Sequence, residues 1–129
     1  INPKRIPGAL VNYMVVAANG GLVAADANSV FVLDAVPANT DLFVGNLGGP
    51  GSGPVAFAAL GSGLTYTFTS LASTTDDVSF SSDGGATFAY TPTPNTSGVD
   101  PAVTHIRINP QGAFNAASSF QLQFRVRVE

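Results

Sequence analysis

The sequence predicts an all-β domain, an antiparallel β-sandwich with Greek-key connections and about eight or nine short strands. Three observations predict it. Apolar and polar residues alternate in several short segments, and Gly, Pro, Asn and Asp separate these segments at short intervals. No window of ten residues has the apolar spacing of an amphipathic helix. The 129 residues suit one domain, which we place at residues 8–129 behind an N-terminal arm of residues 1–7.

The expected strands follow one another with turn residues between them. They are residues 10–18, 29–36, 41–47, 55–60, 64–71, 77–82, 86–91, 103–109 and 120–129. The glycine-rich residues 48–54 are expected to form a flexible loop. The final segment alternates most clearly, and its inward face is expected to carry Phe120, Leu122, Phe124, Val126 and Val128.

A turn motif joins two of these strands. Residues 81–88 fit Ser81-x-Asp83-x-Gly85-x-Thr87-Phe88, which resembles the Asp-box of sialidases and other β-proteins, with Phe in place of Trp. The Asp carboxylate and the Ser and Thr hydroxyls can bond the local backbone and lock a tight hairpin. We therefore interpret the motif as structural.

The composition excludes several classes of function. Charged residues are 10% of the chain, the net charge is −3 and only five residues are basic, so a nucleic-acid interface is not expected. No apolar run is long enough for a membrane span, and the absence of cysteine removes disulfides and thiolate metal sites. The chain begins at Ile1, which we interpret as a processed mature chain or a fragment. Sparse charge also lets copies of the chain pack closely.

The first expected strand is apolar on both of its faces. One face carries Val11, Tyr13, Val15 and Ala17, and the other carries Leu10, Met14, Val16 and Ala18. Two interpretations of the second face stay open. Either a loop such as residues 48–54 covers it within the domain, or it is a subunit contact. The residues of that contact would be Leu10, Met14, Val16, Phe31 and Leu33.

Part of the chain resembles a known family. The matching elements are Pro7-Gly8, Val11-x-Tyr13-x-Val15, Asn19-Gly20, Asp34 and Pro37. They resemble the prokaryotic surface-protein conserved repeat domain, an Ig-like domain whose function is largely unassigned. The resemblance implies an Ig-like fold and an extracellular or cell-surface location in repeats, adhesins or surface assemblies, and it does not imply catalysis.

One departure from that family suggests how copies interact. Its members usually carry a strand before the Pro-Gly turn, whereas residues 1–6 here are short and contain Pro3. Either that strand has been cut away, or a neighbouring copy supplies one. The candidate donors are the arm from Ile1 to Ile6 and the C-terminal strand. We therefore expect a structural subunit of an extracellular filament or pilus-like fibre that self-assembles by strand complementation. The alternative is an adhesion module, one repeat of a larger surface protein, that recognises a glycan or a protein.

No group of residues indicates an enzyme, a metal site or a cofactor. His105 is the only histidine, and no nucleophile stands beside a base. The aspartates are expected to be turn residues, with Asp76-Asp77 the first pair to check for calcium. Asn95-Thr96-Ser97 matches the N-glycosylation sequon, so Asn95 is a candidate for an attached glycan. No aromatic platform for a sugar is expected, because Trp is absent and the tyrosines fall on apolar positions of the pattern.

Overall fold

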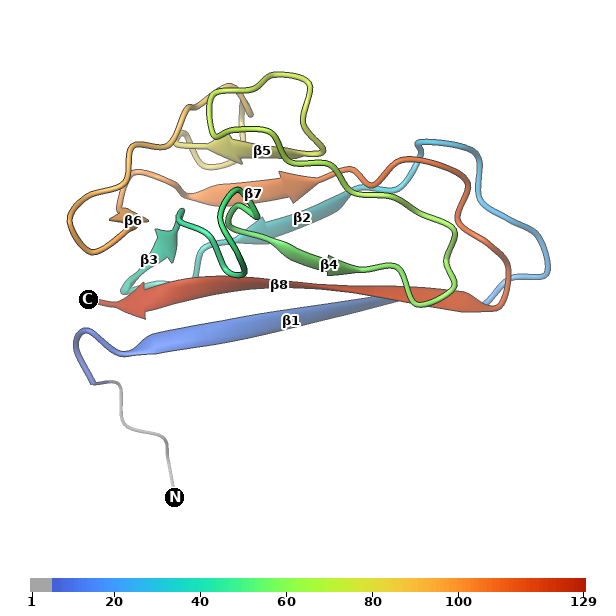
Figure 1. Cartoon of the computed structure of the whole chain (residues 1–129), viewed down its shortest axis with the longest axis horizontal. Coiled ribbons are helices and arrows are strands. Elements are labelled where there is room, and N and C mark those ends of the chain that lie inside the picture. Colours follow the sequence, from blue (N-terminus) through green and yellow to red (C-terminus); the bar gives the residue numbers. More distant parts are fainter. Residues whose placement is uncertain (1–5) are drawn as a thin grey trace.

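The computed structural model describes residues 6–129 and is all-β, with two antiparallel sheets packed face to face (Figure 1). The strands are β1 (Leu10–Asn19), β2 (Val32–Ala35), β3 (Thr40–Phe43), β4 (Ala56–Ala58), β5 (Val78–Ser81), β6 (Val99–Asp100), β7 (His105–Ile108) and β8 (Ser118–Val128). The predicted β-sandwich and its strand number are confirmed. The Greek-key connectivity stays a prediction.

The longest strand, β8, organises the larger sheet, in which the order is β1-β8-β3-β6 and β4 also pairs with β8. One edge of β8 pairs with all of β1, in an unbroken register from Leu10 opposite Arg127 to Asn19 opposite Ser118. Its other edge pairs with β3 and β4. The smaller sheet has the order β2-β7-β5. The C-terminal strand is therefore central, and both of its edges are occupied.

The core lies between the sheets and includes the side chains on the inward face of β8. The expected inward residues of β8, Phe120 to Val128, are all buried, as the alternation predicted. Phe120 packs against Phe114 edge to face and lies next to Phe57 of β4, with ring centroids 5.3 Å and 5.6 Å away. Ile106 and Ile108 of β7 close the core from the other sheet.

Residues 64–70 cover one side of the sandwich, where β4 and β5 lie. Tyr66 stacks on Phe57 of β4 at 5.7 Å, and the backbones of Thr67 and Asp77, next to β5, are hydrogen-bonded at 3.1 Å. We call this side the closed flank. Because β1 and β2 occupy the opposite edges of β8 and β7, their free edges lie on the other side, which we call the open flank.

The strand predicted over residues 64–71 is wrong. Its alternation is real, but the segment makes a single isolated bridge, from Thr65 to Gln111. Carboxylates accept two of its amides: Thr67 N–H donates to Asp77 Oδ2 at 2.7 Å, and Ser70 N–H donates to Asp76 Oδ2 at 3.1 Å. The backbone is satisfied locally and has no continuous ladder.

The turn after β5 has the predicted hydrogen bonds between Asp83, Ser81 and Thr87. Ser81 Oγ donates to Asp83 Oδ1 at 2.7 Å, and the backbone N–H and the hydroxyl of Thr87 donate to the two carboxylate oxygens at 2.9 Å and 2.6 Å. Hydrogen bonds from Ser81 and Thr87 lower the pKa of Asp83 from 3.8 to about 2. The strand expected over residues 86–91 is reduced to a bridge between Tyr90 and Phe80, so the hairpin is partial.

Candidate interaction surface

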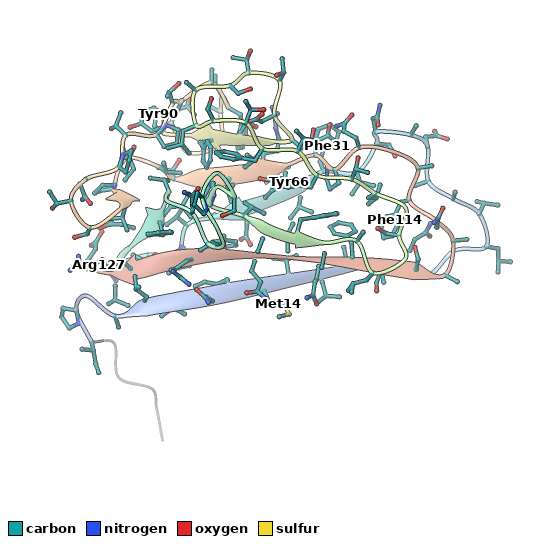
Figure 2. The ribbon with its side chains drawn as sticks, in the orientation of Figure 1. Met14, Phe31, Tyr66, Tyr90, Phe114 and Arg127 are labelled. Carbon is teal, nitrogen blue, oxygen red and sulfur yellow. The ribbon has the colours of Figure 1, made fainter. Side chains whose placement is uncertain are left out.

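The feature that most needs an explanation is the outward face of β1. Leu10, Met14 and Val16 are 55%, 57% and 60% exposed, and Figure 2 shows Met14 pointing away from the sandwich. Their cross-strand partners on β8 are Arg127, Gln123 and Gln121, so an apolar row runs beside a polar one. Of the two interpretations of this face, cover by a loop of residues 6–129 is therefore wrong.

The loop of residues 48–54 lies elsewhere. A side chain at Gly53 would come within 2.5 Å of the Phe68 ring, so this loop packs against the segment that covers the closed flank. It leaves β1 uncovered because its contact is on the other side of the sandwich.

The inward face of β1 is also incompletely covered. Val15 and Ala17 pack against the core, but Val11 and Tyr13 are each 38% exposed. Tyr13 stacks on Phe124 at 5.6 Å, so one face of its ring is held by the core. The assignment of Tyr13 to the core is thus correct for one face of the ring only. The first half of β1 presents apolar surface on both sides of the sheet.

The free edge of β1 lacks the usual protection against pairing with another chain. Proteins blunt such edges with short strands, Lys, Pro or bulges. β1 has ten residues, a length of about 33 Å, and contains neither Lys nor Pro. Its register against β8 has no bulge. A strand of this kind is a template for a further strand.

The edge of β2 is different. It has four residues, and its inward face carries Asp34, which lies opposite buried Ile106. A short strand with an inward-pointing carboxylate is poorly suited to accept another chain. Of the two edges on the open flank, β1 is the unprotected one.

The five predicted contact residues do not form one patch. Leu10, Met14 and Val16 lie on the outer face of the β1 sheet. Leu33 faces outward from the β2 sheet beside Arg107, and Phe31 lines a pocket on that same outer face. Both are exposed, at 58% and 55%, but on the opposite face of the sandwich. The alternation of residues 29–36 places Phe31 and Leu33 on one face of a strand, but it does not reveal to which sheet that strand belongs.

The remaining predicted residues have the following positions. Ile6 is 65% exposed next to β1, whereas Ile1 lies outside the described residues. Asn95 is exposed, and its Oδ1 accepts the backbone N–H groups of Ser97 and Val99 at 2.9 Å and 3.3 Å. The Nδ2 atom, to which an N-linked sugar would be attached, is on the surface turn. The C-terminal strand is unsuitable as a donor because both of its edges are paired within the domain.

The aspartates act mainly on the backbone of turns. Buried Asp100 accepts hydrogen bonds from the Tyr90 hydroxyl at 2.7 Å and from the amides of Thr93 and Ala102 at 2.8 Å and 2.9 Å. Burial raises the pKa of Asp77, against the hydrogen bond from Thr67. Within residues 6–129, no three His, Cys, Asp or Glu residues are grouped so as to hold a metal ion.

A second surface feature lies on the outer face of the β2-β7-β5 sheet. It is a pocket of about 370 Å³ between residues 71–79, 88–91 and the end of the β1–β2 loop. Arg107 lies in it with Ser79, Asp76 and three phenylalanine residues, Phe31, Phe80 and Phe88. Sequence reasoning missed this pocket because irregular segments form its rim.

The comparisons with known proteins add no relative. No family model matches the chain, and neither a curated protein nor a solved structure is significantly similar to it. In the part of the chain that the structure describes, no helix has the length and apolar character needed to cross a membrane.

Proposed function

We propose that this domain is a structural subunit of an extracellular filament or pilus-like fibre and assembles with copies of itself through the free edge of β1. The observation that carries the proposal is the unprotected ten-residue edge with Leu10, Met14 and Val16 exposed beside it. A strand added there gains ladder hydrogen bonds, and its side chains pack beside the apolar row.

The donor in this proposal is the N-terminal arm of a neighbouring copy. Ile6, the end of the arm that the structure describes, is exposed and precedes the accepting strand. A copy that accepts at β1 and donates its own arm makes a head-to-tail contact, and such contacts form open fibres when their rotation does not close. The resemblance to surface repeat domains supports the extracellular location.

The decisive experiment replaces two residues of the apolar row. Met14→Asp with Val16→Asp is expected to leave a folded monomer and abolish fibres, because the new charges would lie beside the side chains of the added strand and replace apolar cross-strand contacts. Circular dichroism measures folding, and light scattering and electron microscopy measure assembly. Leu33→Asp, an equally exposed apolar position on the opposite face, is the matched control and should still form fibres.

Three results would contradict the proposal. The first is unfolding of the double variant, which would place Met14 and Val16 in the core. The second is wild-type protein that stays monomeric at high concentration. The third is unimpaired assembly after deletion of residues 1–6, which would rule out the arm as the donor.

A second function, an adhesion module that recognises a glycan or a protein, is favoured by a different observation. The pocket on the outer face of the β2-β7-β5 sheet is concave, contains both polar groups and aromatic rings, and lies away from β1. A binding module and a fibre subunit are compatible in one domain because the two surfaces are on opposite faces.

A further inference from the structure

The pocket over β5 and β7 has the composition of a ligand site. At about 370 Å³ it lies within the range of small-molecule pockets, and it contains apolar rings together with a small number of polar groups. Figure 2 labels two of its lining residues, Phe31 and Tyr90, on either side of β5 in this view. Its position on the face opposite to the apolar row of β1 makes it independent of assembly.

Arg107 is the principal donor in the pocket. Its Nε donates to Ser79 Oγ at 3.2 Å, and its guanidinium carbon lies 4.6 Å from the centroid of the Phe88 ring. These contacts fix the plane of the side chain and leave its terminal N–H groups available. Within the described chain no carboxylate forms an ion pair with Arg107, so these donors have no charged partner.

Two carboxylates lie in the same pocket and are acceptors. Asp76 Oδ2 takes the N–H of Ser70, and Asp77 Oδ2 takes the N–H of Thr67. Asp76 is also hydrogen-bonded by Thr69 and Ser73, whereas Asp77 has acceptor sites beyond its single bond from Thr67. The pocket therefore offers a donor-only group and acceptor-only groups together, and its lining carries one positive and two negative side chains.

This combination discriminates between classes of ligand. An anion would be attracted by Arg107 but repelled by Asp76 and Asp77, and a cation would be attracted by the two carboxylates but repelled by Arg107. A hydroxyl group both donates and accepts, so a neutral polyol satisfies both kinds of side chain. The exposed ring of Phe31 supplies an apolar surface, which matches the C–H face of a pyranose ring.

We propose that this pocket binds a neutral hexopyranose unit of a glycan, with Arg107 donating to the sugar hydroxyls, Asp77 accepting from them and the Phe31 ring lying against the C–H face. The role of Phe31 is then in ligand binding and not in the contact between subunits. The inference stands whether or not β1 mediates assembly.

The test is a titration of the complete chain followed by ¹H,¹⁵N NMR. The probes are the methyl pyranosides of glucose, galactose, mannose and N-acetylglucosamine, with methyl glucuronate as the charged comparator. At least one neutral glycoside should cause saturable shifts at Ser79, Phe88 and Arg107, with a dissociation constant in the millimolar range expected for so small a ligand. The glucuronate should bind more weakly at the same residues.

Two variants and a matched control make the assignment specific. Phe31→Ala and Arg107→Met should each weaken binding about tenfold or more, as loss of a central contact does. Arg125→Met is the control, since Arg125 lies over the Phe43 ring at 5.4 Å on the other sheet. It should bind as the wild type does, and Phe31→Ala should still form fibres where the wild type does.

Three outcomes would overturn the proposal. They are the absence of saturable shifts with every neutral glycoside, binding that survives both Phe31→Ala and Arg107→Met, and tighter binding of glucuronate at this pocket. The last would identify an anion site. None of them bears on the β1 edge, so a failure here is distinguishable from a failure of the fibre proposal.

Discussion

The closed and open flanks of the sandwich both have apolar segments at their edge, but only the closed flank is covered. Both have more apolar side chains at their edge than the core between the sheets takes up. Residues 64–70 on the closed flank alternate apolar and polar residues, whereas β1 on the open flank is apolar on both of its faces. On the closed flank the chain returns and stacks Tyr66 on Phe57. On the open flank nothing in residues 6–129 pairs with the free edge of β1. The comparison indicates that the apolar pattern identifies a surface that needs cover but does not say which chain supplies it.

The largest expected effect comes from truncating one side chain on each flank. Phe57→Ala removes a ring that contacts both Tyr66 and Phe120 and should lower the free energy of unfolding by about 3 kcal/mol. Met14→Ala on the open flank should change it by no more than about 0.5 kcal/mol in the dispersed monomer. Urea denaturation measures both. Equal losses would show that the outward face of β1 is covered in the monomer.

Lowering the pH should destabilise the turn after β5 before it affects β1. Asp83 has its pKa lowered to about 2 by hydrogen bonds from Ser81 and Thr87. The carboxylate form is favoured in the folded state, so this stabilisation is present above pH 3.8 and is lost as the pH falls through about 2.

The variant Asp83→Asn should therefore lose less stability than the wild type as the pH falls from 3.8 to about 2. Denaturation at a series of pH values measures the difference. Asp26→Asn, in the loop after β1, is the control and should behave as the wild type does. If the stability of Asp83→Asn depends on pH in the same way as that of the wild type, the hydrogen bonds to Asp83 do not stabilise the fold as assigned.

The smallest expected effect tests how well the closed flank is packed. The Tyr66 hydroxyl is buried without a hydrogen-bond partner within the described chain, and burial raises the pKa of Tyr66. Tyr66→Phe should leave stability unchanged or raise it by up to about 1 kcal/mol, because no bond is lost.

Tyr90→Phe is the matched control for Tyr66→Phe. It loses the 2.7 Å hydrogen bond to Asp100 and should destabilise by about 1 kcal/mol. Thermal denaturation of both variants gives the comparison. A destabilised Tyr66→Phe would show that the hydroxyl of Tyr66 has a partner in solution, such as an ordered water.

Local features of the fold were predictable from the sequence. The inward face of β8, a first strand over residues 10–18 and the hydrogen bonds around Asp83 were predicted from alternation and turn residues, which act over a few neighbouring positions. The two-residue β6 was missed because Val99–Asp100 is too short to show a period. The exposed apolar row of β1 was predicted as one of two interpretations, since a strand pattern does not reveal which edge is free.

By itself the sequence determined that this chain is an all-β domain with an excess of apolar surface on its first strand. Only the tertiary structure decided that β8 is central, that residues 64–70 close one flank and that Phe31 and Leu33 lie on the face opposite to Met14. The physical reason is the range of the interactions. Alternation and turns depend on adjacent residues, whereas edges, cover and pockets depend on contacts between segments tens of residues apart.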